Sequence, residues 1–150
     1  MRRKDRSISQ QEAMAILQKA EYGVLSIASL DGEPYGIPLN YCVIGDAIYF
    51  HCAIEGRKLD ILSRNDSVSF CVVGDTEVLP EKFGMKYESV IISGAAQEVM
   101  RSEKQLALES LLKKYSQAFY NEGIEQIKPN INRTRVYKII IQTITGKAHK

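Results

Sequence analysis

Two adjacent cations, Arg57 and Lys58, stand at the predicted start of an amphipathic helix that ends near Asn65. The unpaired backbone N–H groups of a helix start and the helix dipole both favour a bound phosphate. An arginine can bind a phosphate bidentately, and a lysine adds a point charge. The pair therefore indicates an anion site, although two solvated surface cations would produce the same local pattern.

His51 lies near the end of the predicted strand 47–53, at the strand end nearest to these two cations. Imidazole changes its charge close to neutral pH, so a histidine beside a phosphate can hold the anion or move a proton. A lone histidine on a strand is also often a structural residue. The sequence leaves both interpretations open.

A turn at Gly45-Asp46 would pair strand 47–53 with strand 34–44 as a hairpin. Alternation along the strands then separates an apolar face from a mixed face. The apolar face, expected in the core, comprises Ile37, Leu39, Tyr41, Val43, Ile48, Phe50, Cys52 and Ile54. The mixed face comprises Pro38, Asn40, Cys42, Tyr49, His51 and Ala53.

In this register Cys42 faces Tyr49 and Asn40 faces His51. A face of aromatic, polar and small groups suits a planar polar ligand or another subunit better than bulk water. Together with the neighbouring cations, this face predicts a phosphorylated, planar cofactor.

Two further residues are expected to interrupt the sheet. Pro38 removes a hydrogen-bond donor, so strand 34–44 is predicted to be an edge strand or to be bulged at that point. Gly94 predicts a bulge or a close approach of another backbone, with no implication for function.

Periodicity and turn signals predict the elements that position these residues. A capping box at Ser9 begins a helix over 10–20, and a second box at Ser102 begins a helix that continues to Phe119. The predicted strands are 22–29, 34–44, 47–53, 67–73, 88–99 and 135–145, the first three as a meander. A long loop through Pro80 and a loop containing Pro129 join the later elements. The pattern predicts a mainly β (α+β) fold, a small antiparallel barrel with flanking helices.

A chain of 150 residues, 45% apolar and 25% charged, is typical of one globular domain, here 1–150. A net charge of +2 with scattered cations argues against a nucleic-acid partner. No apolar run approaches the ~20 residues of a membrane span, and no secretory signal follows the basic start, so we expect a cytoplasmic protein. Three widely spaced cysteines predict neither a disulfide framework nor a metal site.

The segment "DGEPYGIPLNYCVIGDAIYFHCAIEGRKLDIL" closely resembles the FMN-binding split-barrel superfamily, which includes the pyridoxamine 5′-phosphate oxidases. Within it, the segment is most similar to the 5-nitroimidazole reductase and resistance family. The resemblance continues through "KYESVIISGAAQEV", "EKQLALESLLKKY" and "RVYKIIIQTITGKA". It implies a six-stranded antiparallel Greek-key split β-barrel that forms a homodimer, with two FMN sites at the subunit interface.

The resemblance also implies roles for residues at the cation corner. Arg57 and Lys58 would hold the FMN phosphate, with His51 beside the phosphate or ribityl end. Gly56 would let the backbone approach the cofactor. His51 is also the candidate catalytic residue, because a histidine near the flavin has been given that role in the nitroimidazole reductase family.

Further contacts are implied for the flavin ring. The segment Pro38-Leu39-Asn40 would run along the isoalloxazine edge, and its backbone groups would form hydrogen bonds with the polar atoms of the ring. Ser89 would reach the same site from the other subunit. A site completed in this way requires two chains.

The function implied by the resemblance is that of an FMN-dependent oxidoreductase that reduces a small acceptor, such as a nitroaromatic compound of the 5-nitroimidazole type. The ending "TITGKAHK" stands where pyridoxamine phosphate oxidases have an Arg-x-x-x-Pro-type sequence that holds their substrate, so that substrate is not expected. One alternative is a non-enzymatic flavin-binding or electron-carrying module. Another is a split barrel that binds a deazaflavin, or haem with His51 as an axial ligand.

Overall fold

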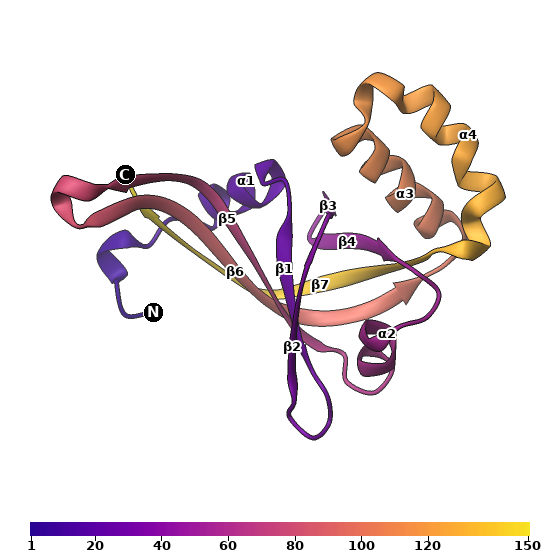
Figure 1. Ribbon diagram of the computed structural model, residues 1–150, viewed down its shortest axis with the longest axis horizontal. Coiled ribbons are helices and arrows are strands. Elements are labelled where there is room, and N and C mark those ends of the chain that lie inside the picture. The colour runs from indigo at the N-terminus through magenta and orange to yellow at the C-terminus, as the bar shows by residue number, and fades with distance from the viewer.

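Seven antiparallel strands form one strongly curved sheet in the computed structural model, which describes residues 1–150 (Figure 1). Along the sheet the strands follow the order β2-β1-β5-β6-β7-β4-β3. Their bounds are Gly23–Ala28 (β1), Pro34–Leu39 (β2), Cys42–Ile44 (β3), Ala47–Cys52 (β4), Ser67–Leu79 (β5), Gly84–Val99 (β6) and Arg135–His149 (β7). The predicted mainly β fold with flanking helices is confirmed, and the sheet curls without closing.

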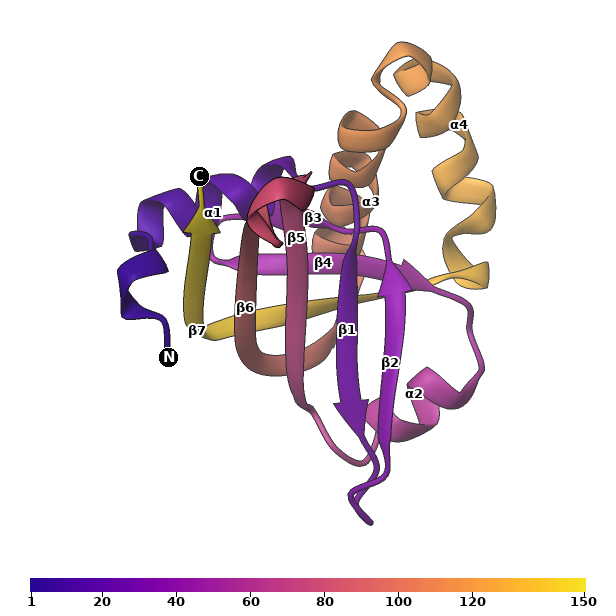
Figure 2. The ribbon, with the colours of Figure 1, turned by 60° about the vertical axis from the view of Figure 1, so that its left-hand side comes forward.

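The predicted number of six strands is wrong, because strand 34–44 is interrupted at Asn40 and Tyr41. Its first part, β2, pairs with β1, whereas its second part, β3, pairs with β4 in the predicted register. β2 and β3 therefore lie at opposite edges of the sheet, and the predicted meander does not form as one ladder. Figure 2 shows the reason, since β4 runs across the direction of β1 and β2. The edge position of β2 agrees with the prediction from Pro38.

The side chain of Tyr115 satisfies the backbone at this interruption. Its hydroxyl accepts a hydrogen bond from the N–H of Tyr41 at 2.9 Å. The same hydroxyl lies 2.9 Å from the carbonyl oxygen of Tyr41 and 2.6 Å from that of Glu21, and its single proton can be donated to either. One side chain thus joins the broken strand to the segment before β1.

We expect Tyr115→Phe to lower the free energy of unfolding by about 1–2 kcal/mol, because the Tyr41 N–H then loses its partner. Urea denaturation followed by circular dichroism measures the change. Tyr22→Phe is the matched control, since the Tyr22 hydroxyl forms no hydrogen bond and the side chain is 60% exposed. Equal stabilities of the two variants would contradict this role of Tyr115.

The first two helices pack beside the inner face of the sheet. Helix α1 (Gln10–Lys19) confirms the predicted helix and its capping box, in which the Glu12 N–H donates to the Ser9 hydroxyl and the Ser9 N–H donates to the Glu12 carboxylate. Helix α2 (Arg57–Leu62) is shorter than predicted. Short 3₁₀ turns occur at Lys4–Arg6, Pro80–Lys82, Gln117–Phe119 and Ile131–Arg133.

Helices α3 (Arg101–Tyr115) and α4 (Tyr120–Asn130) form a hairpin on the other side of the sheet (Figure 1). The capping box predicted at Ser102 does not form, because α3 begins two residues earlier than predicted, with Met100 at the N-cap position and no side-chain cap. The loop predicted around Pro129 is also wrong, since this residue lies in the last turn of α4. A proline there removes only one late helical hydrogen bond.

The long loop predicted through Pro80 is a β-hairpin arm instead. β5 and β6 continue their pairing to Leu79 and Gly84, so that only a 3₁₀ turn and Phe83 separate them. In Figure 1 the arm extends to one side of the molecule, and the C-terminal end of β7 runs beside its β6 strand as far as Tyr87. At its tip Phe83 is 97% exposed.

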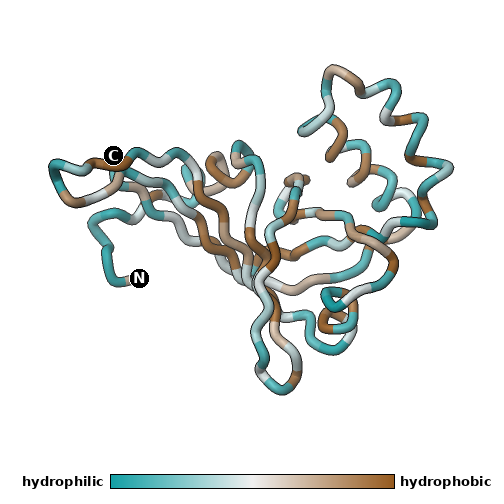
Figure 3. Tube along the Cα trace, in the orientation of Figure 1, coloured by the Kyte–Doolittle hydropathy of each residue, from teal (hydrophilic) through white to brown (hydrophobic).

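The main core lies between the sheet and helices α1 and α2, and Figure 3 shows the apolar segments that converge there. Of the predicted apolar face, Tyr41, Ile48 and Phe50 are fully buried in this core. Ile54 is an exception, because it lies beyond the end of β4 and is 49% exposed.

Gly94 lies in the core region of β6, where the register with β7 shifts, so the predicted bulge and close approach are confirmed. A Cβ atom added at Gly94 would overlap the carbonyl oxygen of Ile140. None of the helices is both long enough and apolar enough to cross a membrane.

Candidate functional site

Arg57 begins α2 with its guanidinium group near the surface. The group forms an ion pair with the Glu33 carboxylate at 2.9 Å and lies 4.4 Å from the centroid of the Tyr35 ring. The Arg57 side chain is 52% exposed and that of Glu33 is 70% exposed. Exposed ion pairs of this kind contribute about 0–1 kcal/mol, so an anionic ligand can displace the carboxylate.

Lys58 is the freer of the two cations, because it forms no ion pair with a carboxylate. Its ammonium group lies 5.8 Å from the centroid of the Phe50 ring. Gly56, which precedes the pair, has a φ of 142°, and a Cβ atom there would meet nothing within 4 Å. The corner therefore has open space beside two accessible cations and a backbone that can be approached closely.

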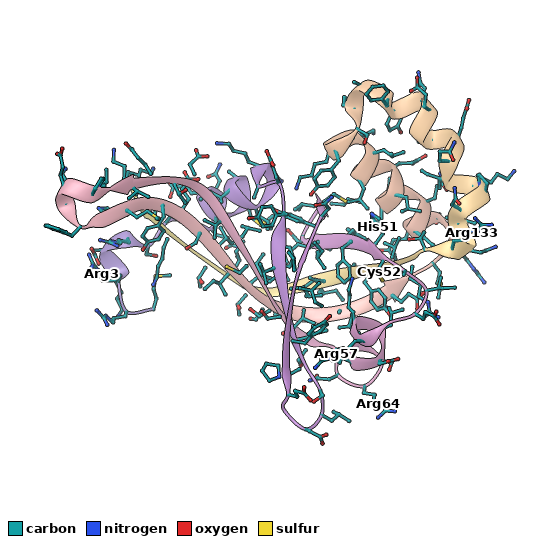
Figure 4. The ribbon with its side chains drawn as sticks, viewed as in Figure 1. Arg3, His51, Cys52, Arg57, Arg64 and Arg133 are labelled. Atoms are coloured by element: carbon teal, nitrogen blue, oxygen red, sulfur yellow. The ribbon has the colours of Figure 1, made fainter.

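His51 belongs to β4 and is exposed on the side of α3, whereas Arg57 is the first residue of α2 (Figure 4). Its ring forms no hydrogen bond within the chain. Partial burial, and then the charge of Lys58, lower the pKa of His51 below its usual value. The imidazole is therefore neutral at pH 7, and both a donor and an acceptor nitrogen are available to a ligand.

The predicted pairing of Asn40 with His51 is not part of the sheet. The ladder between β3 and β4 ends at Cys42 and Tyr49, and His51 instead pairs with Val136 of β7. The interruption of the strand is the physical reason, since Asn40 lies outside both β2 and β3. Asn40 and His51 nevertheless line the same recess beneath helices α3 and α4.

Two residues of the predicted mixed face are not available to a ligand or to another subunit. Cys42 and Tyr49 are 4% and 7% exposed because α3 covers them. The Tyr49 hydroxyl donates to Glu103 of α3 at 2.7 Å, and burial, followed by this contact, raises the pKa of Tyr49 to about 12. The alternation of residues along the hairpin could not reveal that a helix of the same chain covers part of its outer face.

The remaining predicted site residues lie in different places. Pro38 is exposed at the end of β2, opposite Val24, and the side chain of Leu39 packs against the main core. Ser89 pairs with Val73 and Lys147 on β6. At ~3.3 Å per residue, Ser89 lies roughly 30 Å along β6 from the strand end near His51, so one chain does not bring Ser89 to the cation corner.

The outer face of the sheet, away from α3, carries no charged side chain over two adjacent rows. Residues directly opposite each other across the antiparallel ladders share a face. One row is Val24, Cys71, Ile91 and Thr145, and the next is Ser26, Ser69, Ser93 and Thr143. Val24 is 38% exposed and Ile91 is 53% exposed. We call these eight residues the neutral face.

The thiols of Cys42, Cys52 and Cys71 are all free. Burial raises the pKa of each thiol above its usual value, so none is a thiolate at neutral pH. The structure contains no cluster of three or more His, Cys, Asp or Glu residues that could hold a metal ion.

Helix α4 contributes residues to the recess that the sequence did not indicate. Gln126, Ile127 and Asn130 line it together with the end of α3. The helical spacing of Ile124 and Ile127 was the available signal for α4. Gly123 and Pro129 disfavour a helix, so this spacing alone did not predict one.

Residues 9–148 match the family model described as pyridoxamine 5′-phosphate oxidase. A candidate 5-nitroimidazole antibiotic resistance protein from Bacteroides thetaiotaomicron is 24% identical, with a TM-score of 0.78 over 94% of this chain and 85% of that one. A FAD-binding protein from Mesorhizobium loti is 21% identical, with a TM-score of 0.68 over 97% and 98% of the two chains.

A FAD- and haem-binding protein from Mycobacterium smegmatis is 16% identical, with a TM-score of 0.83 over 95% of this chain and 72% of that one. At these identities the solved structures establish a shared fold. No curated protein matches the sequence.

Proposed function

The chain belongs to the pyridoxamine 5′-phosphate oxidase family, and from this premise we propose that it is an FMN-dependent oxidoreductase that acts as a homodimer on small nitroaromatic or related acceptors. The observation that carries the proposal is the corner at Gly56, Arg57 and Lys58. It combines open space with two accessible cations, one of them without any carboxylate partner. These are the requirements of a phosphate site.

The residues of the corner fit the phosphate end of FMN. Arg57 exchanges its weak contact with Glu33 for charge-assisted hydrogen bonds to the phosphate, and Lys58 adds a second cation. His51 lies close enough to Lys58 for that charge to lower its pKa, so it adjoins the same anion. We assign His51 a binding role first and a catalytic role second.

The flavin ring is assigned to the segment Pro38-Leu39-Asn40. Asn40 lies outside both strands, at the interruption of the sheet, so its backbone groups are not committed to a ladder. When bound, FMN supplies the electron-transfer chemistry, and the chain supplies position, field and access. The similarity to the candidate nitroimidazole resistance protein supports a nitroaromatic acceptor.

The neutral face supports the homodimer. A sheet face that is exposed to water commonly carries charged side chains. These eight positions instead hold only apolar residues, small polar residues and a cysteine. A second copy packed on this face would also bring its Ser89, which continues the same side of β6, toward the site of the first chain.

Absorption spectroscopy and sedimentation test the proposal together. The purified protein, mixed with FMN and desalted, is expected to keep one FMN per chain, to show the flavin bands and to sediment as a dimer. Turnover of a nitroaromatic compound with NADH or NADPH separates an enzyme from a flavin-carrying module. A protein that stays colourless after reconstitution contradicts the assignment of FMN as the cofactor. A monomer that binds one FMN per chain contradicts a site shared between two subunits.

Haem is the second candidate, because His51 has a free imidazole beside an apolar recess and the FAD- and haem-binding protein from Mycobacterium smegmatis shares the fold. Haem carries two propionates, yet the lining of the recess contains no lysine or arginine to pair with them. A Soret band would favour haem over FMN. A deazaflavin would lack the flavin bands of FMN in the same spectrum.

We expect Glu33→Gln to tighten FMN binding by up to about five-fold, because it frees Arg57 from a competing carboxylate contact worth about 0–1 kcal/mol. Quenching of flavin fluorescence measures the dissociation constant. Glu55→Gln is the control, since it makes the same change of net charge without an ion pair to break. If the two variants bind FMN equally well, Glu33 does not compete for Arg57.

A further inference from the structure

The recess between α3 and α4 is a second feature of the molecule, distinct from the cation corner. It has a volume of about 420 Å³ and opens toward Asn40 and His51. Its walls are Leu108, Leu111, Leu112, Tyr115, Ser116, Gly123, Gln126, Ile127, Asn130 and Thr134. The volume lies in the range of small-molecule sites.

Local sequence explains why the recess exists. At Gly123 the two helices approach so closely that a Cβ atom there would overlap the side chain of Leu112. The absence of a side chain at this position permits the approach. Farther along, Ile127 is the only buried residue of α4, while α3 covers the sheet through Ala107 and Leu111. The space between α4 and the strand ends is therefore left unfilled.

Four polar side chains of the recess have no partner within the chain. The amide groups of Asn40 and Gln126, the imidazole of His51 and the hydroxyl of Ser116 form no hydrogen bond. Other polar side chains are engaged, since Thr134 donates to the Cys52 carbonyl at 3.0 Å and Asn130 donates to the Gln126 carbonyl at 2.8 Å. The free groups can bind a ligand at one edge of an otherwise apolar site.

The charge of the recess selects among ligands. Its lining contains no Asp, Glu, Lys or Arg, and His51 is neutral at pH 7. A carboxylate or ammonium group placed there would lose its hydration without gaining a counter-ion. An uncharged ring meets leucine and isoleucine side chains and reaches the amides with a polar substituent.

We propose that the recess binds an uncharged, planar, mostly apolar molecule with one polar edge. The inference that this class of ligand binds depends only on the shape and lining of the recess. Its role as the acceptor site rests on the proposed function, because Asn40 and His51 belong both to the recess and to the assigned cofactor site.

Two nitroaromatic probes of similar size test the charge selection. 4-Nitrobenzyl alcohol is uncharged and 4-nitrobenzoate is an anion, and binding of each is followed by amide NMR shifts in the full chain. We expect the alcohol to shift residues of α3 and α4 and to bind at least about ten-fold more tightly than the benzoate. Equal affinities, or shifts elsewhere, overturn the proposal.

A blocking variant tests the position. Gln126→Trp fills the recess from an exposed helix position, and Glu125→Trp is its neighbour outside the lining. The chain has no other tryptophan, so emission at shorter wavelength from Gln126→Trp shows that the indole is folded into the recess. We expect this variant to lose at least about ten-fold in affinity for the alcohol, and the control to lose none. Unchanged binding in Gln126→Trp overturns the proposal.

FMN binding distinguishes this inference from the proposed function. If FMN binds equally to the wild type and to both tryptophan variants, and does not displace the alcohol, the recess is a separate acceptor site. If FMN displaces the alcohol, the recess is part of the cofactor site and the proposal fails. If no FMN binds but the alcohol binds as described, the ligand site stands, while the acceptor role and the flavin function both fail.

Discussion

The double variant Arg57→Ala/Lys58→Ala is expected to lose at least about a hundred-fold in FMN affinity. Each alanine removes a charge-assisted contact to the phosphate worth about 1.5–3 kcal/mol, or about one to two orders of magnitude. The Arg57 contact is expected at the lower end, because this side chain is exposed and already weakly paired with Glu33. Titration of FMN fluorescence gives the dissociation constants.

The control variant has to remove the same two positive charges at positions away from the proposed phosphate site. Arg64→Ala/Lys82→Ala also removes two exposed cations, but Arg64 lies beyond the end of α2 (Figure 4) and Lys82 at the tip of the β5–β6 arm. We expect this control to change FMN affinity by less than about three-fold. The phosphate assignment fails if the Arg57/Lys58 variant binds FMN as tightly as the control does.

Gly94→Ala is expected to lower the free energy of unfolding by about 3 kcal/mol or more. The added Cβ atom would overlap the carbonyl oxygen of Ile140, which belongs to the backbone of β7 and cannot rotate away as a side chain would. The Cγ2 atom of Ile139 also lies 3.1 Å from the added carbon. Relief requires β6 and β7 to separate at the bulge, with loss of ladder hydrogen bonds and core packing.

Gly36→Ala is the comparison for this effect. It lies on edge strand β2, where the nearest atom to an added Cβ is a Val24 methyl group at 3.9 Å. Since alanine also restricts the unfolded chain, we expect this variant to be as stable as the wild type or slightly more stable. Urea denaturation measures both variants, and similar midpoints would show that the bulge tolerates a side chain.

Local signals predicted the elements that depend on few residues. The turn at Gly45-Asp46 fixed the pairing of Cys42 with Tyr49, and the Ser9 capping box fixed the start of α1. The interruption at Asn40 and Tyr41 could not be predicted from local sequence, because it depends on where β1 and β4 lie relative to each other. Helix α4 was hidden because Gly123 serves packing against Leu112 and Pro129 falls in the final turn.

The candidate site likewise combines features that local sequence predicts with features that depend on the tertiary fold. His51, Arg57 and Lys58 are close in sequence, and the structure places them close enough for Lys58 to lower the pKa of His51. The contact of Arg57 with Glu33 joins the start of α2 to the turn between β1 and β2, and no local pattern indicates it. The roles assigned to these residues, and the position of Ser89 in a second subunit, stay predictions until binding is measured.

The interrupted strand also bears on how the protein resists aggregation. Exposed sheet edges are templates for the addition of strands from other molecules, and both edges of this sheet come from the one interrupted strand. β3 has only three residues, and β2 contains Pro34 and Pro38, which offer no N–H to an incoming chain. The break that positions Asn40 thus leaves the two outermost strands of the sheet either short or interrupted by proline, which makes both of them poor templates for an added strand.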